Sequence, residues 1–337
     1  MPIPELSEEQ KNSMYLASGS THEQLARDTA EHLGVELGPV DHRTFGNSEI
    51  WMRYEESVRM KHVFVIQSMA AVAGKSINDS LVEAGLMADT ARKASAREVT
   101  VVAPHLAYAR QDRKNLGRDP LSAAWAIKML LNSGANRLVA VDIHSAQSQG
   151  SSDEPFDLLT ASDLIGEALK ARVGDSPEDF IVVSPDAGAL KANEGYAKLL
   201  DTEVTFMSKT RDRTNPSLIQ PRKVIGDVAG KVCIITDDMI DSAKTLVSAI
   251  DALYKAGAKD VIVSATHGIF SDGALERLQQ SGASEIIVTD TVPQGDAREA
   301  LGDRLTVLPI APVLAEAIAA IATGTSLSKT FGGNSYS

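Results

Sequence analysis

The chain has 337 residues, of which 43% are hydrophobic and 23% are charged. At about 150 residues per domain, this length predicts two domains, and the composition is that of a globular protein. The 45 acidic and 33 basic residues give a net charge of −12. That balance argues against a nucleic-acid partner, because a phosphate backbone requires clustered cations. A single cysteine, Cys233, excludes an internal disulfide and a cysteine-rich metal site.

Neither a membrane span nor a signal peptide is predicted from the sequence. No apolar stretch approaches the roughly 20 residues that a membrane span requires. The nearest candidate, residues 311–322, contains Glu316. The first 13 residues are too polar for the apolar core of a signal peptide. We therefore expect a cytoplasmic protein with no membrane partner.

Seven short apolar runs recur along the chain, and a loop with polar residues follows each of them. The runs are rich in β-branched residues and do not alternate with polar ones, which is typical of strands buried on both faces. They span residues 63–66, 99–103, 138–141, 180–183, 232–235, 261–264 and 286–289. Ligands of parallel sheets bind beyond the carboxyl ends of the strands, so these loops are the candidate site.

Helical patterns separate the apolar runs. One predicted helix begins at Ser122 and ends before Gly134, and a second contains Leu246 and Ile250 and ends before Gly257. This alternation predicts an α/β fold with mainly parallel sheets flanked by helices. The predicted domains are residues 14–155 and 156–325, with tails at 1–13 and 326–337.

The most informative segment follows the apolar run at 232–235. Asp237 and Asp238 come first, then Asp241, then the hydroxyl residues Ser242 and Thr245 near a predicted helix start. Carboxylates can accept hydrogen bonds from vicinal sugar hydroxyls, and amides at a helix start can bind phosphate. The segment therefore predicts a sugar-phosphate site. The alternative is an acidic first turn of a helix, which the helix dipole favours.

A cationic loop occupies residues 108–120. Its cations are Arg110, Arg113, Lys114 and Arg118. Such a loop can close over a polyphosphate, with Gly117 as a hinge. The alternative is a charged loop that is simply solvated.

Two further groups of residues suit phosphate chemistry. Asp142 and His144 follow one predicted strand and Asp186 follows the next, where carboxylate oxygens suit Mg²⁺. The alternatives are a structural histidine and a turn aspartate. Lys209 and Arg211 lie on one side of the chain if the preceding strand continues, where two cations can stabilise a transferring phosphoryl group. The alternative is a solvated strand end.

These segments, in this order, resemble the ribose-phosphate pyrophosphokinases, also called phosphoribosyl-pyrophosphate synthetases. The resemblance covers the chain from about Tyr15 to Phe331. Its anchoring strings are residues 55–59, 66–68, 108–112, 141–144, 147–150, 183–186, 237–241 and 266–268. It implies two tandem phosphoribosyltransferase-like domains, Mg-ATP and ribose 5-phosphate as substrates, and the products 5-phosphoribosyl 1-pyrophosphate and AMP. It also implies a homo-oligomer, a hexamer, in which a paralogous subunit can take part.

The resemblance implies a role for each matching residue. For ATP binding these residues are Phe45, Asn47, Glu49, Arg110, Gln111 and Asp112. For Mg²⁺ they are His144, Asp186 and Asp142, and for transition-state stabilisation they are Lys209 and Arg211. For ribose 5-phosphate they are Asp237, Asp238, Asp241, Ser242, Ala243, Lys244 and Thr245.

Two departures from the family pattern bear on activity. The ribose-phosphate loop usually reads Asp-Thr-x-Gly-Thr, and here Lys244 stands at the glycine position. A lysine is strained there if φ is positive, whereas its amide still functions if φ is helical. Ser151 and Ser152 replace two aromatic residues that are usual in the family. A non-catalytic paralogue that associates with or regulates a true synthetase is therefore an alternative, and a phosphoribosyltransferase-type protein is a third.

Overall fold

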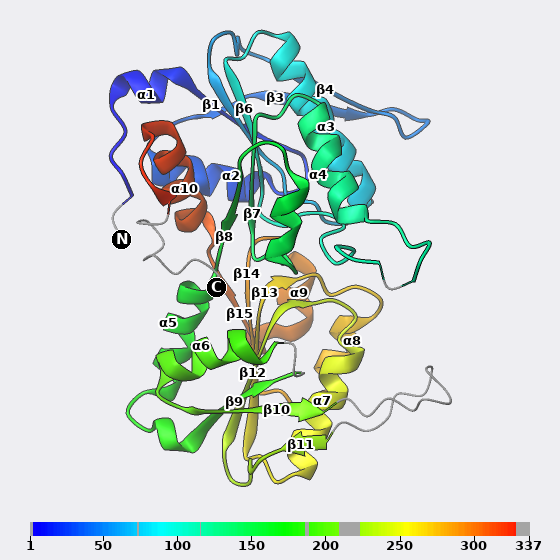
Figure 1. Cartoon of the computed structure of the whole chain (residues 1–337), viewed down its shortest axis with the longest axis vertical. Helices are drawn as coiled ribbons and strands as arrows, with labels where there is room; N and C mark the ends of the chain where they lie inside the picture. Colours follow the sequence, from blue (N-terminus) through cyan, green and yellow to red (C-terminus); the bar gives the residue numbers. More distant parts are fainter. Residues whose placement is uncertain (1–2, 73, 115, 186–188, 209–222, 328–337) are drawn as a thin grey trace. The chain divides into compact units, whose positions relative to one another are not determined.

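The computed structural model describes residues 3–72, 74–114, 116–185, 189–208 and 223–327. The chain forms two compact units, each built on a mainly parallel sheet flanked by helices (Figure 1). The first unit comprises Met1–Thr160, Thr291–Pro293 and Pro309–Ser337, and the second comprises Ala161–Asp290 and Gln294–Leu308. None of the helices in the described ranges has the length and apolar character that a bilayer crossing requires. The predicted α/β fold is confirmed.

The first unit contains a six-stranded sheet in which every neighbouring pair is parallel. In sheet order, its strands are β2 (Leu37–Gly38), β1 (Met14–Ser18), β5 (His62–Ile66), β6 (Glu98–Ala103), β7 (Arg137–Val141) and β8 (Phe156–Leu159). Strands β1 and β5 are buried along their whole length, and the apolar run at 63–66 correctly predicted β5. Strand β8 follows the predicted boundary at 155 but pairs with β7, so it belongs to this unit.

Helices cover both faces of the first sheet. They are α1 (Glu8–Ser13), α2 (Glu23–Leu33), α3 (Ile77–Lys93), α4 (Ser122–Asn132), the 3₁₀ helix η1 (Ala146–Ser151) and α10 (Ala311–Thr323). Helices α3 and α4 lie on one face, whereas α2 and α10 pack on each other at the opposite face (Figure 1). Two placements differ from the predicted ranges: α1 lies within the predicted tail 1–13, and α10 packs in the first unit.

A two-stranded antiparallel hairpin stands outside the first sheet. It consists of β3 (Val40–Thr44) and β4 (Ile50–Tyr54). The hairpin packs on α3, where the Tyr54 hydroxyl donates to the carbonyl of Met87 at 2.9 Å. The loop between the two strands contains Phe45 and Glu49. The hairpin therefore presents this predicted nucleotide-binding segment beside α3.

The second unit contains a seven-stranded sheet, parallel except for its edge pair β10–β11. Its strands, in sheet order, are β11 (Lys223–Ile225), β10 (Glu203–Ser208), β9 (Phe180–Ser184), β12 (Val232–Ile240), β13 (Asp260–Gly268), β14 (Glu285–Thr289) and β15 (Leu305–Leu308). The helices are α5 (Ser162–Val173), η2 (Pro177–Asp179), α6 (Leu190–Leu200), α7 (Lys244–Lys255), α8 (Ala274–Gln279), α9 (Gly295–Leu301) and η3 (Gly302–Arg304). Helices α5 and α6 lie on one face, and α7, α8 and α9 lie on the other (Figure 1).

Strand β12 extends further than its neighbour β9. It pairs with β9 as far as Ile235 and with β13 as far as Ile240. Asp237 and Asp238 therefore lie beyond the end of the pairing with β9, on a part of β12 that has a neighbouring strand on the β13 side. A buried hydrogen bond anchors the strand just before these carboxylates: the Thr236 hydroxyl donates to Asn193 Oδ1 on α6 at 2.6 Å. The start of the predicted sugar-phosphate segment is thus fixed by the core.

We expect the substitution Thr236→Val to lower the free energy of unfolding by about 1–3 kcal/mol, because it leaves a buried amide oxygen of Asn193 without its donor. Urea denaturation followed by circular dichroism measures the effect. The control Thr44→Val, at an exposed position of β3, is expected to stay within about 0.5 kcal/mol of the original chain. Equal effects of the two substitutions would contradict the anchoring role of Thr236.

Candidate active site

The predicted sugar-phosphate segment forms a tight turn between β12 and α7. Ala243 has φ 56° and ψ 0°, so the left-handed residue of the turn is this alanine. Lys244 is the first residue of α7 and is not among the described residues with positive φ. The first backbone amides of a helix have no partner within the helix and can bind an anion. The lysine at the glycine position therefore adopts a helical conformation and keeps its amide at the helix start.

The alternative interpretation of this segment, an acidic first helical turn, is wrong. The first turn of α7 contains no acidic residue. Asp237 and Asp238 lie on β12 instead, and Asp241 lies in the turn itself. The carboxylates and the helix start are therefore two separate elements that the turn brings together.

Residues that follow β13 hold this turn in place. The Ser271 hydroxyl donates to Asp241 Oδ1, and Arg277 donates to the carbonyl of Ser242 at 2.8 Å. Lys244 Nζ donates to Asp272 Oδ2 at 2.6 Å, and this hydrogen bond holds the pKa of Asp272 below its usual value. Sequence analysis missed these supporting residues. Their only signal was their place shortly after the string at 266–268.

The described metal candidates lie at the carboxyl end of β7. Asp142 is half-buried and has a left-handed φ of 38°, and His144 is exposed two residues later. Asp186, the third candidate, lies outside the described residues, within which no cluster of three metal-binding side chains occurs. Mg²⁺ keeps several water ligands and is often held by one or two carboxylates together with substrate phosphates. The carboxylate of Asp142, in a solvent-accessible loop, fits an ion of that kind, whereas His144 offers a nitrogen and not the oxygen that Mg²⁺ prefers.

The predicted catalytic pair also lies outside the described residues. Strand β10 ends at Ser208, immediately before Lys209. Lys209 and Arg211 therefore stay a prediction from the sequence.

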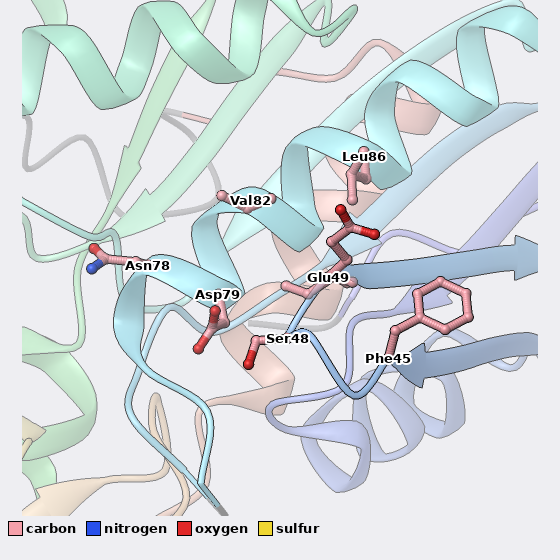
Figure 2. Close-up of a pocket in the computed structure, with 8 residues that line it drawn as sticks. Phe45, Ser48, Glu49, Asn78, Asp79, Val82 and Leu86 are labelled. Carbon is pink, nitrogen blue, oxygen red and sulfur yellow. The ribbon is translucent and has the colours of Figure 1, made fainter.

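The loop between β3 and β4 forms one wall of an open pocket of about 440 Å³ (Figure 2). Residues from the loop and from α3 line it: Phe45, Ser48, Glu49, Ile50, Asn78, Asp79, Val82 and Leu86. The loop is closed by a hydrogen bond from the Phe45 amide to the Glu49 carbonyl at 2.9 Å, and the Asn47 side chain accepts from the Glu49 amide at 3.2 Å. Two of the three predicted residues, Phe45 and Glu49, face the pocket, whereas Asn47 shapes the loop.

The second predicted nucleotide segment is tied to the same pocket. The hydroxyl of Tyr108 donates to the Asn78 side chain in the pocket wall. Gln111 lies three residues further along, where its side chain accepts from the Ser122 hydroxyl at 2.6 Å and so fixes the start of α4. Arg110 is exposed and Asp112 is half-buried. Both ATP-binding candidates therefore adjoin one pocket, since the segment at 108–112 is bonded to its wall at Asn78, which sequence analysis had not identified.

A capping box explains why α3 presents Asn78 and Asp79 at the pocket. The Ser76 hydroxyl accepts from the Asp79 amide at 3.3 Å, and the Asp79 carboxylate accepts from the Ser76 amide at 2.7 Å. The bond from the Ser76 amide to the Asp79 carboxylate, and after it one that the Ser76 hydroxyl donates to the same carboxylate, hold the pKa of Asp79 below its usual value. The spacing Ser-x-x-Asp before an apolar run is a signal that the sequence does contain.

We expect Lys244→Gly to lower the free energy of unfolding by up to about 1 kcal/mol, because glycine weakens a helix start and the bond to Asp272 is lost. Urea denaturation measures the change. Lys244→Ala loses the same bond but keeps a good helix former, so the comparison isolates the backbone effect. A gain in stability with glycine would indicate a strained lysine and contradict the helical geometry.

Comparison with known proteins identifies the family. Residues 14–134 match the N-terminal domain of ribose phosphate pyrophosphokinase, and residues 181–332 match the phosphoribosyl synthetase-associated domain. The ribose-phosphate pyrophosphokinase of Bifidobacterium longum is 42% identical over 320 residues, which cover 95% of this chain and 92% of the relative. The ribose-phosphate pyrophosphokinase of Corynebacterium efficiens is 42% identical over 328 residues, which cover 97% of this chain and 98% of the relative.

A solved structure agrees with these matches. The crystal structure of phosphoribosylpyrophosphate synthetase from Mycobacterium smegmatis is similar with a TM-score of 0.85 and 40% sequence identity. The similarity covers 93% of this chain and 99% of that one. The resemblance inferred from the sequence motifs is confirmed, and the chain belongs to the ribose-phosphate pyrophosphokinase family.

Proposed function

We propose that the chain is a ribose-phosphate pyrophosphokinase, an enzyme that converts Mg-ATP and ribose 5-phosphate into 5-phosphoribosyl 1-pyrophosphate and AMP. The observation that carries the proposal is the turn between β12 and α7. It joins strand carboxylates to a helix start at the carboxyl edge of a parallel sheet, where ligands of such sheets bind. A sugar phosphate requires both elements at once.

In the proposed complex, ribose 5-phosphate occupies this turn. Asp237 and Asp238 accept hydrogen bonds from the ribose hydroxyls. The 5-phosphate receives donors from the residues that surround the start of α7, namely Asp241, Ser242, Ala243, Lys244 and Thr245, through backbone amides, the two hydroxyls and the lysine. The residues after β13 keep the turn in shape before the substrate arrives, so less ordering is required on binding.

ATP is assigned to the loops of the first unit. Phe45 offers an exposed ring for the base, and its side chain is 50% exposed in the single chain. Asn47 and Glu49 belong to the same loop, and Arg110, Gln111 and Asp112 belong to the segment bonded to the pocket wall at Asn78. The exposed Arg110 can supply charge-assisted hydrogen bonds to phosphate oxygens.

The reaction is a displacement at phosphorus. The oxygen of the ribose C1 hydroxyl forms a bond to the β-phosphorus of ATP, and the bond from that phosphorus to the bridging α–β oxygen breaks. AMP leaves with the bridging oxygen, and the hydroxyl proton passes to solvent. Lys209 and Arg211 stabilise the charge on the transferring group, so catalysis depends on positioning and electrostatics. Asp142, His144 and Asp186 would hold Mg²⁺, which supplies charge neutralisation on the phosphates.

Assembly and location belong to the same proposal. By resemblance to the family we expect a homo-oligomer, a hexamer, acting in the cytoplasm, and a paralogous subunit is compatible with it. The non-catalytic alternative rested on Lys244 and on the serine pair at 151–152. The helical conformation of Lys244 removes the strain argument. At the serine pair, the Ser152 hydroxyl donates to the Glu154 carbonyl at 2.6 Å and closes a local turn.

The chain is expected to form AMP and 5-phosphoribosyl 1-pyrophosphate in equal amounts from Mg-ATP and ribose 5-phosphate, and to stop when EDTA removes the metal. Quantitative chromatography of the nucleotides measures the products. Lys209→Ala is the control, because it removes a proposed transition-state contact. AMP formation no greater than that of the control would contradict catalysis and favour the non-catalytic paralogue.

The two substrates are expected to respond to different substitutions. Asp237→Asn removes a charged acceptor and should raise KM for ribose 5-phosphate about tenfold or more, since such a bond contributes about 1.5–3 kcal/mol. Arg110→Ala should raise KM for ATP by a similar factor for the same reason. Steady-state kinetics with each substrate varied in turn separates the effects. Equal effects of either variant on both KM values would contradict the assignment.

A further inference from the structure

One fully buried carboxylate in the first unit has no role in the proposed reaction. Glu83 lies on α3 and is 0% exposed. Its Oε2 accepts hydrogen bonds from the Ser20 hydroxyl at 2.6 Å, the Ser20 amide at 3.2 Å and the Gln67 side chain at 2.6 Å. Ser20 follows β1 and Gln67 follows β5. The carboxylate therefore joins α3 to the carboxyl ends of two neighbouring strands.

The other oxygen of Glu83 faces the hairpin. Oε1 lies 2.9 Å from His42 Nδ1 on β3 and 3.6 Å from Lys75 Nζ, in the segment before α3. Two further charged groups act on the pair: Asp79 on α3 interacts electrostatically with Glu83, and Asp41 on β3 with His42. The ends of β1 and β5 present neutral Ser20 and Gln67. Lys75 also donates to the Ser20 hydroxyl.

The geometry of the His42 ring fixes its protonation. Nε2 lies 2.9 Å from the carbonyl oxygen of Ser18, which can only accept, so Nε2 carries a hydrogen. Nδ1 lies 2.9 Å from a carboxylate oxygen, which also only accepts when ionised. In a neutral ring, Nδ1 and Glu83 Oε1 would be two acceptors facing each other, and each would be left without a donor inside the protein. The contact therefore requires a hydrogen on both ring nitrogens.

The proton is assigned to the histidine by the environment of Glu83. Burial by itself raises the pKa of this carboxyl, but the hydrogen bonds from His42 and Ser20 and the nearby charge of His42 and Lys75 outweigh it and lower the pKa to about 2. The carboxyl of Glu83 is thus ionised.

The position of His42 gives this contact a consequence for the pocket. His42 lies on β3, three residues before Phe45, and Glu83 lies on α3 next to the pocket residue Val82. The two pocket walls in Figure 2, the hairpin loop and α3, are therefore joined by the ion pair.

We propose that Glu83 and His42 are positioning residues, a proton-dependent latch that holds the β3–β4 hairpin against α3 and so sets the shape of the nucleotide pocket. The latch is closed while His42 carries both hydrogens and weakens as the pH rises and Nδ1 loses its hydrogen. The link to ATP rests on the proposed function, whereas the hairpin and its pH dependence do not.

The first experiment measures the hairpin without any substrate. Hydrogen–deuterium exchange gives protection factors, corrected for intrinsic rates, for residues 40–44 and 50–54 between about pH 6 and about pH 8.5, the range in which histidine commonly titrates. We expect protection of the hairpin to fall about tenfold across this range, while protection of β6 and β7 stays constant. Trp51 on β4 is a second reporter in a Trp125→Phe background, because the chain has two tryptophans.

Three variants separate the latch from a merely structural role. In Glu83→Gln, the new amide nitrogen can donate to a neutral His42 Nδ1 while the remaining oxygen still accepts from Ser20 and Gln67, so protection should rise with pH instead of falling. In His42→Asn, the amide donates at every pH, so the pH dependence should vanish. In Glu83→Ala, protection of the hairpin should be low throughout. If Glu83→Ala does not fold, the test is the comparison of the original chain with Glu83→Gln, in which hairpin protection is expected to change with pH in opposite directions.

The matched control is His62→Asn. His62 is also a buried histidine of the first unit, bonded to Thr100 at 2.8 Å, and burial lowers its pKa to about 4, so it stays neutral over the tested range. In the His62→Asn variant, we expect protection of the β3–β4 hairpin to change with pH as it does in the original chain. A hairpin whose protection does not change with pH, or the same slope in Glu83→Gln as in the original chain, would overturn the proposal.

The kinetic arm tests the link to the nucleotide. With the original chain, KM for ATP should rise about tenfold over the same pH range relative to Glu83→Gln, while KM for ribose 5-phosphate changes equally in both. Absence of AMP formation together with the expected exchange slopes would reject the proposed function and support the latch. If the enzyme is active and KM for ATP changes with pH in the same way in the original chain and in Glu83→Gln, the latch does not set the shape of the nucleotide pocket.

Discussion

Parallel strand pairing is the constraint on which the candidate site depends. Because neighbouring strands of a parallel sheet run in one direction, their carboxyl ends meet at one edge, and every loop that leaves this edge is a potential ligand contact. In the first unit this edge supplies Gln67 and Asp142, and in the second it supplies Asp237 and the turn to α7. The helices on both faces exclude water from the strands and leave that edge as the accessible part.

At the second edge, one strand is longer than its neighbour, and this difference in length creates the geometry for a sugar phosphate. The carboxylates of β12 project past the end of the pairing with β9, and the turn at Ala243 then redirects the chain into α7. The left-handed conformation at Ala243 has a steric cost of about 1–2 kcal/mol. The contacts from Ser271 and Arg277 hold the turn in that conformation. A supporting shell of this kind is common where a substrate-binding loop must be preorganised.

The sequence predicted the elements whose signal is local and left out those that depend on long-range contacts. Unalternating runs such as residues 63–66 and 232–235 correctly predicted buried parallel strands. The hairpin β3–β4 was missed because most of its residues are half-buried or exposed, so that they form no buried apolar run, and because its strands pair with each other outside the main sheet. The pairing of β8 with β7 and the packing of α10 in the first unit were not predicted either, since neither leaves a pattern in the local sequence.

For the candidate site, residue type was readable from the sequence, whereas conformation was not. The family resemblance implied Phe45 and Glu49, and the residue types after an apolar run indicated Asp237, but whether Lys244 is strained depends on φ, which one sequence does not specify. The partners of Glu83 come from four separate segments, so no spacing in the sequence could have indicated them.

Helix α10 has a consequence for how the protein is made. It is synthesised after the whole second unit, yet it packs on α2 within the first, and most of its apolar side chains are buried. As the chain leaves the ribosome, the first unit therefore lacks the cover for one face of α2 until the last helix emerges, whereas residues of the second unit can already assemble. The first unit is thus the first to be synthesised and the last to be completed. Until α10 emerges, the uncovered face of α2 is a surface that chaperones can protect during translation.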